Sequence, residues 1–448
     1  MLIRFSVENY KCFKDRAELS MLASPFAQLP EHVMRSEGGA SGIVRAAAIY
    51  GANGSGKTKF IDGLSTIQRL VTTSFKPRQS LPIEKFALGT SKNSAAVKLE
   101  VLYKVSERVF QYGLVADKTS VKEEWLFEIS GTREICCFER VTREEKTEII
   151  VGPGFARKGS KEYQKLALIS SATGHNQTFL NKAWENQSPK AAIAISWFFD
   201  VLQIIGADAE FESLEVAIRE DEKFSHFLAQ YLKAVGTGIE SIKTIEREVD
   251  IENLFKTLSD ESRQNALKQL DGGATIVVSS PRGSLSKISK TEAGKFVEFQ
   301  LRAVHSVAEG EPVAFDFKAE SHGTQRLVHL LPAVFEASIR QKVFVIDELD
   351  RKLHTLLVRQ FLIGFLAKTQ LVGSQIVFTT HDTNLLDQEV LRRDEIWFVE
   401  KCPLSGGAVL YPLTDFEPRH DLKLDRGYLQ GRFGAIPFFG DLKALFGK

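Results

Sequence analysis

A glycine-rich segment at residues 51–58 is the part of the chain whose residue types point most directly to a chemistry. It reads Gly-Ala-Asn-Gly-Ser-Gly-Lys-Thr and follows a short apolar run at 46–50. The run predicts a buried strand. Glycines after it let backbone N–H groups surround a phosphate, and the helix that follows directs its positive end at the same point. We therefore predict a phosphate loop, rather than an ordinary Gly/Ser loop with a solvated lysine. Lys57 would reach the β- and γ-phosphates, and the Thr58 hydroxyl would bind Mg²⁺. The residues predicted to contact the nucleotide are Gly51, Asn53, Gly54, Ser55, Gly56, Lys57 and Thr58.

Two further buried-strand patterns end in polar residues. Residues 343–346 are apolar and precede Asp347 and Glu348, and residues 375–380 precede His381. A strand that ends in two acids suits a metal-dependent hydrolysis, in which Asp347 holds Mg²⁺ and Glu348 polarises the attacking water. A histidine that ends a strand of a parallel sheet projects over the nucleotide edge and can sense a γ-phosphate.

A second candidate anion site reads Glu-Ser-His-Gly-Thr-Gln at 320–325, before an apolar stripe at helical spacing. This pattern places Ser321 and Gly323 at the start of a helix, where a serine commonly caps the helix and where backbone N–H groups can also bind an anion. Two interpretations stay open: a plain helix cap, or a second phosphate clamp that acts on a nucleotide bound by another copy of the chain.

Periodicity indicates the elements that position these residues. Alternating apolar residues predict an antiparallel strand pair at 3–7 and 17–21, and a β-rich stretch at about 95–150. Apolar residues at helical spacing dominate from about 155 to 275, which predicts a helical insert without a long coiled coil. Strand patterns return at 296–301 and 313–317.

Composition adds few constraints. The chain has 448 residues, of which 43% are hydrophobic, and a net charge of +1, which favours neither nucleic acid nor a membrane surface as a partner. Its four cysteines have no metal-binding spacing, and no window is long and apolar enough to span a bilayer. We therefore expect a soluble, cytoplasmic protein with reduced thiols.

The order of these motifs resembles the ABC-class ATPase heads of the SMC, RecF and OLD lineage, and more closely the stand-alone AAA-15 ATPases of bacteria. The opening segment 5–13, the segment 108–114 and the closing segment 428–437 are similar to features of that family. The resemblance covers roughly residues 1–130 and 296–440. It implies an α/β fold of the ABC-type P-loop ATPase head: a mixed central sheet flanked by helices, an antiparallel β-subdomain and a helical insertion.

The resemblance also implies a domain order and a mechanism. The expected parts are an N-terminal ATPase lobe at 1–150, a mainly helical insertion at 151–295 and a C-terminal lobe at 296–448.

ATP and Mg²⁺ would be held between two copies in a homodimer or higher homo-oligomer, with Ser321 and Gly323 of one copy closing on the γ-phosphate bound by the other. Asp350 would lie in the loop that crosses the interface, and His381 would be the switch histidine. Lys11 and Phe13 would contact the base or a phosphate. The glutamine that usually joins the metal shell has no clear counterpart, since Gln68 falls inside the first predicted helix.

Similar stand-alone ATPases occur in PARIS-type, Septu-type and retron-linked anti-phage systems. The resemblance thus implies a sensor or scaffold that responds to a phage-encoded trigger and controls a separate nuclease or toxin effector. The alternative is a RecF- or SMC-like repair ATPase that binds duplex DNA through Arg4, Lys11, Lys14 and Arg16. Phe433, Phe438 and Phe439 near the carboxyl terminus either cap the core or dock a partner.

Overall fold

The computed structural model describes residues 1–35, 42–88, 96–143, 146–211, 214–256, 258–279, 285–291, 293–306, 310–403, 405–417 and 422–436. The chain forms two compact units. Unit 1 comprises Met1–Asp208, Glu336–Arg351 and Thr355–Lys448, and unit 2 comprises Ala209–Phe335 and Lys352–His354. The chain therefore passes between the units several times, and each unit is described by itself.

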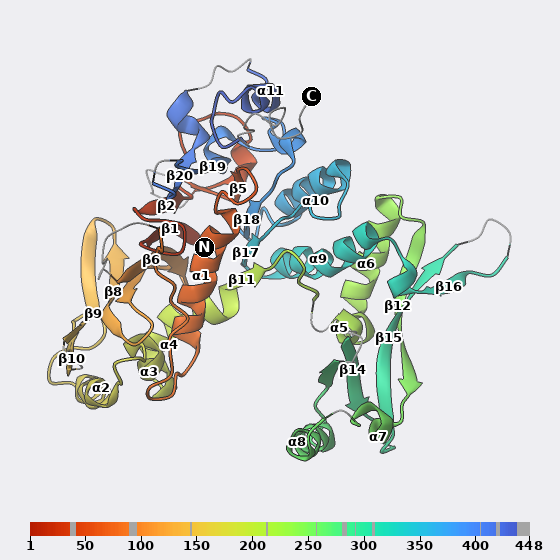
Figure 1. Cartoon of the computed structure of the whole chain (residues 1–448), viewed down its shortest axis with the longest axis horizontal. Helices are drawn as coiled ribbons and strands as arrows, with labels where there is room; N and C mark the ends of the chain where they lie inside the picture. The colour runs from red at the N-terminus through yellow and green to blue at the C-terminus, as the bar shows by residue number, and fades with distance from the viewer. Residues whose placement is uncertain are drawn as a thin grey trace, which may run out of the picture. The chain divides into compact units, whose positions relative to one another are not determined.

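The central sheet of unit 1 has six strands in the order β11-β17-β18-β5-β19-β20 (Figure 1). The first five strands run parallel, and β20 pairs antiparallel with β19. The strands are β11 (Leu202–Ile205), β17 (Val343–Ile346), β18 (Gln375–Thr379), β5 (Ala46–Tyr50), β19 (Ile396–Lys401) and β20 (Ala408–Pro412). The strands predicted at 46–50, 343–346 and 375–380 are thus confirmed, and the structure shows that they lie side by side. Because they are parallel, the residues that follow them meet at one edge of the sheet.

A second, antiparallel sheet of seven strands completes the core of unit 1, in the order β10-β9-β8-β7-β6-β1-β2. Its register pairs Phe5 with Leu19 and Val7 with Ala17, which confirms the predicted N-terminal strand pair. Helix α1 (Lys57–Thr72) packs on this sheet, with Phe60 edge-on to Phe5 at 5.3 Å between ring centroids. The strands are β1 (Leu2–Glu8), β2 (Ala17–Ser20), β6 (Val97–Val105), β7 (Arg108–Ala116), β8 (Val121–Ser130), β9 (Arg133–Arg143) and β10 (Lys146–Val151).

The helices that follow this sheet also belong to unit 1. They are α2 (Lys161–Ala172), α3 (Phe179–Glu185) and α4 (Pro189–Ser196), followed by a short π-helix at Trp197–Val201. A buried carboxylate fixes α3, since Glu124 accepts the backbone N–H groups of Phe179 at 2.7 Å and Leu180 at 3.1 Å and pairs with Arg140 at 3.5 Å. This placement suits an anion at the positive end of a helix. The remaining elements of unit 1 include β3 (Val33–Met34), β4 (Ile43–Val44), α10 (Thr355–Lys368) and α11 (Leu424–Leu429).

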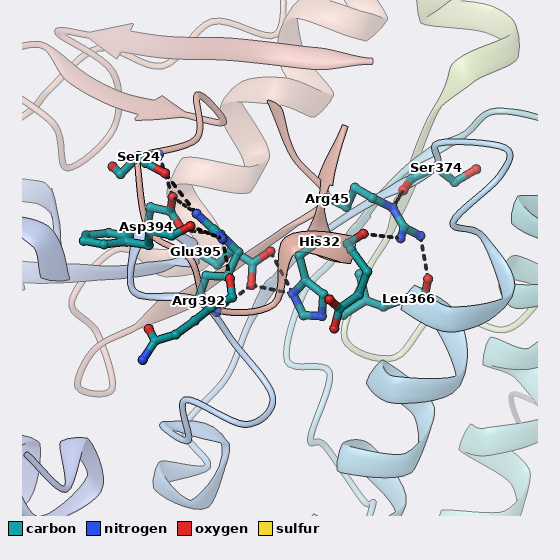
Figure 2. Close-up of polar contacts among 11 residues, drawn as sticks. Ser24, His32, Arg45, Leu366, Ser374, Arg392, Asp394 and Glu395 are labelled. Carbon is teal, nitrogen blue, oxygen red and sulfur yellow. Dashed lines mark hydrogen bonds and ion pairs between the residues drawn. The ribbon is translucent and has the colours of Figure 1, made fainter. Parts of the chain in front are cut away.

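A buried polar network joins the N-terminal segment to the turn that precedes β19 (Figure 2). His32 Nδ1 lies 3.2 and 3.0 Å from the two carboxylate oxygens of Glu395, which is fully buried. The Arg392 guanidinium bonds both oxygens of Asp394 at 2.9 Å, and Asp394 accepts the backbone N–H of Ser24 at 2.7 Å. Buried charges of this kind are retained only where partners satisfy them, so the network fixes a segment that has little secondary structure of its own.

Unit 2 is a mixed α/β unit. Its antiparallel sheet has the order β12-β15-β14-β13, with β16 also paired to β15. The strands are β12 (Ile239–Glu248), β13 (Ile276–Ser279), β14 (Leu285–Lys290), β15 (Phe296–His305) and β16 (Val313–Asp316). The helices are α5 (Leu214–Glu220), α6 (Glu222–Ala234), α7 (Ile251–Leu254), α8 (Asp260–Asp271) and the start of α9 (His322–Ile339). Residues 151–295 contain the predicted helices α2 to α8, together with an antiparallel sheet in unit 2 that was not predicted there. The boundaries differ too: the helices at 161–196 pack within unit 1, and unit 2 continues past 295 to Phe335.

Candidate functional site

The phosphate loop occupies the turn from β5 into α1, as the sequence predicts. A Cβ atom at Gly51 would lie 2.4 Å from the carbonyl oxygen of Val399, so only glycine fits there. Gly56 is the N-cap of α1 with φ 120°, and a Cβ atom on it would lie 2.7 Å from Cys12 Sγ. Because the N-cap is a glycine, no side chain caps α1, and the amides of its first turn are available to a phosphate.

Asp347 and Glu348 directly follow β17, and Thr379 at the end of the neighbouring strand fixes both. The Thr379 hydroxyl donates to Asp347 Oδ1 at 2.6 Å and accepts the backbone N–H of Glu348 at 2.7 Å. Glu348 has φ 48°, a left-handed conformation that a non-glycine residue adopts only where its surroundings impose it. Thr379 is thus a site residue that sequence reasoning missed, because its role depends on pairing between two strands far apart in the chain.

A single pocket of about 370 Å³ brings the predicted loop together with Glu348 and His381. Asp350, from the turn after β17, accepts the backbone N–H of His381 at 3.1 Å and so holds the two strand ends together. The lining residues are Cys12, Asn53, Gly54, Ser55, Gly56, Lys57, Thr58, Lys59, Glu348 and His381. Of these, Cys12 and Lys59 were not predicted as site residues, although they neighbour Lys11 and Thr58 in sequence.

The charged groups of this pocket shift one another's pKa values. Lys57 is buried, and its amine donates to the carbonyl oxygens of Gly51 at 2.7 Å and Ala52 at 3.2 Å. Burial lowers the pKa of Lys57 to about 8, against the opposing effect of the nearby Asp347 and Glu348 carboxylates. Burial, with the positive charge of Lys57, also lowers the pKa of His381, so its imidazole is neutral at pH 7. A bound polyphosphate would supply the negative charge that Lys57 otherwise obtains only from these acids.

The residues present suit Mg²⁺ and a polyphosphate. Thr58 offers a hydroxyl in the pocket, and Asp347 offers a carboxylate whose Oδ1 is already oriented by Thr379. Within the part of the chain that the structure describes, Ser55 Oγ and Asp350 Oδ1 are buried without a hydrogen-bond partner. Unpaired buried polar atoms are costly, and a bound ligand or water could satisfy them. Hydroxyl and carboxylate oxygens are the ligands that Mg²⁺ prefers.

Ser321 and Gly323 lie in unit 2, at the start of α9. Ser321 Oγ accepts the backbone N–H of Thr324 at 3.1 Å, which is ordinary N-cap geometry. A Cβ atom on Gly323 would lie 2.7 Å from the carbonyl oxygen of Lys352, so the glycine already has a packing role within unit 2. Action of these two residues on the nucleotide of another copy stays a prediction.

The two residues expected to contact the base or a phosphate lie near the loop in different roles. Phe13 is fully buried and packs edge-on to Phe60 of α1, with ring centroids 5.8 Å apart. It therefore belongs to the core beneath the phosphate loop and is not exposed to a ligand. Lys11 Nζ pairs with Asp62 of α1 at 2.8 Å. Gln68 lies inside α1 and donates to the carbonyl oxygens of Phe198 and Leu202, at 2.7 and 3.0 Å, so its role is structural.

Other expectations concern the rest of the chain. All four cysteines are free, and the described residues contain no cluster of metal-ligand type. Within the described ranges no helix has both the length and the apolar character needed to cross a membrane. Phe433 is buried and stacks on Phe398, with ring centroids 5.8 Å apart, whereas Phe438 and Phe439 lie outside the described residues.

The phosphate loop follows β5, the two acids follow β17, and His381 follows β18, which lies between those strands. This is the arrangement of a P-loop nucleotide-binding site. The chain belongs to the family described as "AAA domain, putative AbiEii toxin, Type IV TA system", whose sequence pattern matches residues 46–146 and 185–387. This match includes the phosphate loop, Asp347, Glu348 and His381.

The solved structures that resemble the chain include two SMC heads. The SMC head domain from Thermotoga maritima is 11% identical over 92% of this chain and 98% of that one, with a TM-score of 0.37. An SMC head bound to the C-winged helix domain of ScpA is 12% identical over 92% and 96%, with a TM-score of 0.39. Scores this low support no conclusion about function. No curated protein matches the chain.

Proposed function

We propose that this chain is an Mg²⁺-dependent ATP hydrolase that dimerises around ATP. The observation that supports it best is the pocket in which the phosphate loop, Glu348 and His381 meet. Phosphoryl transfer needs positioning and neutralisation of charge, and this pocket offers a lysine, helix amides, a carboxylate and an imidazole for those tasks.

The geometry supports the following roles. Lys57 leaves the carbonyl groups of its own loop to bind the β- and γ-phosphates, and the α1 amides bind the remaining oxygens. Thr58 and Asp347 would hold Mg²⁺, which would neutralise phosphate charge. Glu348 orients the attacking water and accepts its proton, and neutral His381 donates a hydrogen bond to the γ-phosphate.

Dimerisation rests on Ser321. Its side chain is exposed at the start of α9, two residues before Gly323, which packs against the carbonyl group of Lys352. We propose that these groups complete the ATP site of a second copy, so that hydrolysis is much faster in a dimer than in a single chain.

The test combines two substitutions. Glu348→Gln removes the base, so the variant should bind ATP without hydrolysing it and double its mass in light scattering when ATP is added. Adding Ser321→Arg to this variant should leave ATP bound and prevent the doubling. Ser259→Arg is a matched control, because Ser259 is also an exposed N-cap serine of unit 2, whose side chain accepts the N–H of Ser262 at the start of α8. A Ser321→Arg chain that still dimerises with ATP contradicts the shared site, and normal phosphate release by Glu348→Gln contradicts the catalytic assignment.

For the biological role we propose a defence ATPase that responds to a phage-encoded trigger and controls a separate nuclease or toxin effector. The description of the matched family, which includes a type IV toxin–antitoxin system, supports this context. Co-expression with the product of the neighbouring gene should lower phage plaque counts, and Lys57→Ala should abolish the protection. Equal protection by Lys57→Ala would exclude ATP from the response.

The alternative is a repair ATPase that binds duplex DNA. Its proposed basic face is largely neutralised, since Arg4 lies 3.9 Å and Arg16 2.5 Å from the same carboxylate, Glu18, and Lys11 is paired with Asp62. DNA binding that weakens steeply with salt would favour the alternative, and no binding at low salt would exclude it.

A further inference from the structure

The catalytic-base candidate Glu348 is held by an arginine that has a second acidic partner. The Arg351 guanidinium lies 2.9 Å from Glu348 Oε2 and 2.9 Å from Asp208 Oδ2, and all three residues belong to unit 1. The backbone N–H of Arg351 also donates to the carbonyl oxygen of Glu348 at 3.0 Å, which closes the turn after β17. We call these three residues the Arg351 cluster.

Two residues of the cluster, Asp208 and Arg351, are each the last residue of a unit 1 segment. Asp208 is the last residue of unit 1 before the chain enters unit 2 at Ala209, and Arg351 is the last before it enters unit 2 again at Lys352. The ion pair between Asp208 and Arg351 therefore joins two of these crossings. Ala209 and Lys352 are each joined to a residue of this ion pair by a single peptide bond.

The first turns of α9 contact both residues that follow the cluster. Arg326 donates to the carbonyl oxygen of Ala209 at 3.0 Å, and the Cα of Gly323 packs so closely on Lys352 that an added Cβ atom would lie 2.7 Å from its carbonyl oxygen. The segment that carries Ser321 is thus connected to Glu348 through short steps, by way of Lys352 and Arg351.

We propose that Arg351 is a positioning residue that restrains Glu348 in the single subunit and releases it when the Ser321–Gly323 turn engages the nucleotide of a second copy. A carboxylate oxygen that is bonded to a guanidinium is not free to orient water. The inference rests on the proposed function, and it adds a reason why ATP hydrolysis by an isolated chain should be slow.

The test is Arg351→Gln in the full chain, measured at protein concentrations where the wild type is monomeric. The ion pairs are partly exposed, with 39% of the Arg351 side chain accessible, so their loss should raise the basal rate by about two- to fivefold and not by orders of magnitude. The KM for ATP should not change, because Arg351 does not line the pocket. The rate should also depend less on protein concentration.

Two variants act as controls. Arg351→Lys keeps the charge and should behave nearly as the wild type. Arg359→Gln removes another arginine of unit 1 that also bonds two carboxylates, Asp387 and Glu389, and should leave the ATPase rate unchanged. Added salt should raise the wild-type basal rate relative to that of Arg351→Gln, because it screens exposed pairs.

The outcomes separate this inference from the function on which it rests. A basal rate of Arg351→Gln that is equal to or below the wild-type rate, with unchanged ATP affinity and melting temperature, overturns the restraint. A wild type without ATPase activity, or a Glu348→Gln variant that retains it, overturns the proposed function instead.

Discussion

Arg45 provides a test of how the phosphate-loop strand is anchored. It directly precedes β5 and is almost fully buried, and Figure 2 shows its guanidinium directed at the carbonyl groups of Leu366 and Ser374. Leu366 lies in the last turn of α10, where carbonyl groups lack helical partners and a cation is favourable. Arg45→Met keeps much of the apolar volume of the side chain and removes the charge and its donors.

The magnitude follows from two opposing terms. Arg45 donates to the carbonyl oxygens of Leu366 at 2.8 Å, Glu31 at 3.2 Å and Ser374 at 3.4 Å, and to the hydroxyl of Thr369. At about 1.5 kcal/mol each, these bonds from a charged donor stabilise the fold by about 6 kcal/mol. Burial lowers the pKa of Arg45 from its usual 12.5 to about 10. At about 1.4 kcal/mol per pKa unit, burying the charge costs about 3 kcal/mol. We therefore expect Arg45→Met to reduce the unfolding free energy of unit 1 by about 3 kcal/mol.

Tryptophan fluorescence during urea unfolding measures this change in unit 1 alone, because Trp125, Trp184, Trp197 and Trp397 all lie there. Arg133→Met, at an exposed position of β9, is the control and should change stability by less than about 0.5 kcal/mol. Below the unfolding transition, ATP affinity should be unchanged, since Arg45 lies at the amino end of β5 and the loop at its carboxyl end. A loss below about 1 kcal/mol would refute the calculation. A tenfold loss of ATP affinity without loss of stability would refute the separation of the two ends.

Two further predictions concern single residues. Burial lowers the pKa of His329 in α9 to about 4, and its Nδ1 accepts the N–H of Phe211 at 3.1 Å. Above pH 6.5 the histidine is neutral in both states. Below pH 6.5 only the unfolded chain takes up a proton, so stability should fall by up to about 3 kcal/mol by pH 4. His329→Asn keeps an acceptor without titrating and should flatten this slope in thermal melts followed by circular dichroism; an unaltered slope would contradict the assignment. Gly56→Ala should weaken ATP binding at least tenfold in a calorimetric titration, because the Cβ atom meets Cys12 Sγ at 2.7 Å and φ is 120°. Cys12→Ala should recover only part of the loss, since the backbone strain remains, and full recovery would show that the thiol alone causes it.

The elements of unit 1 that position the site could be predicted because their signals are local. A glycine-rich loop between an apolar run and a helix can be recognised from neighbouring residues alone, and so can two acids after an apolar run. Strands β5, β17 and β18 confirm all three strand predictions. Which strands are neighbours was not predictable in this way. The role of Thr379 depends on β18 lying beside β17, so no local pattern indicates it.

Strand β12 shows how a local irregularity can hide an element. Its apolar residues Ile239, Ile242 and Ile245 are spaced by three, which is typical of a helix. The register against β15 shifts between Ile239 and Ser241, and this β-bulge turns Ile239 and Ile242 to the same buried side. Ile245 is exposed, as period-two alternation after the bulge requires. The helices predicted on either side of this strand are present as α6, α7 and α8, and the bulge explains why β12 between them lacks the plain alternation of a strand.

The division of the chain also bears on catalysis. The segment Lys352–His354 belongs to unit 2, although the chain before it (Glu336–Arg351) and after it (Thr355–Lys448) belongs to unit 1. It follows shortly after Asp347 and Glu348, the two acids that follow β17. This segment places the carbonyl oxygen of Lys352 against Gly323, directly after Arg351, which pairs with Glu348. The proposed coupling between the Ser321–Gly323 turn and Glu348 therefore needs only the short stretch of chain from Glu348 to Lys352.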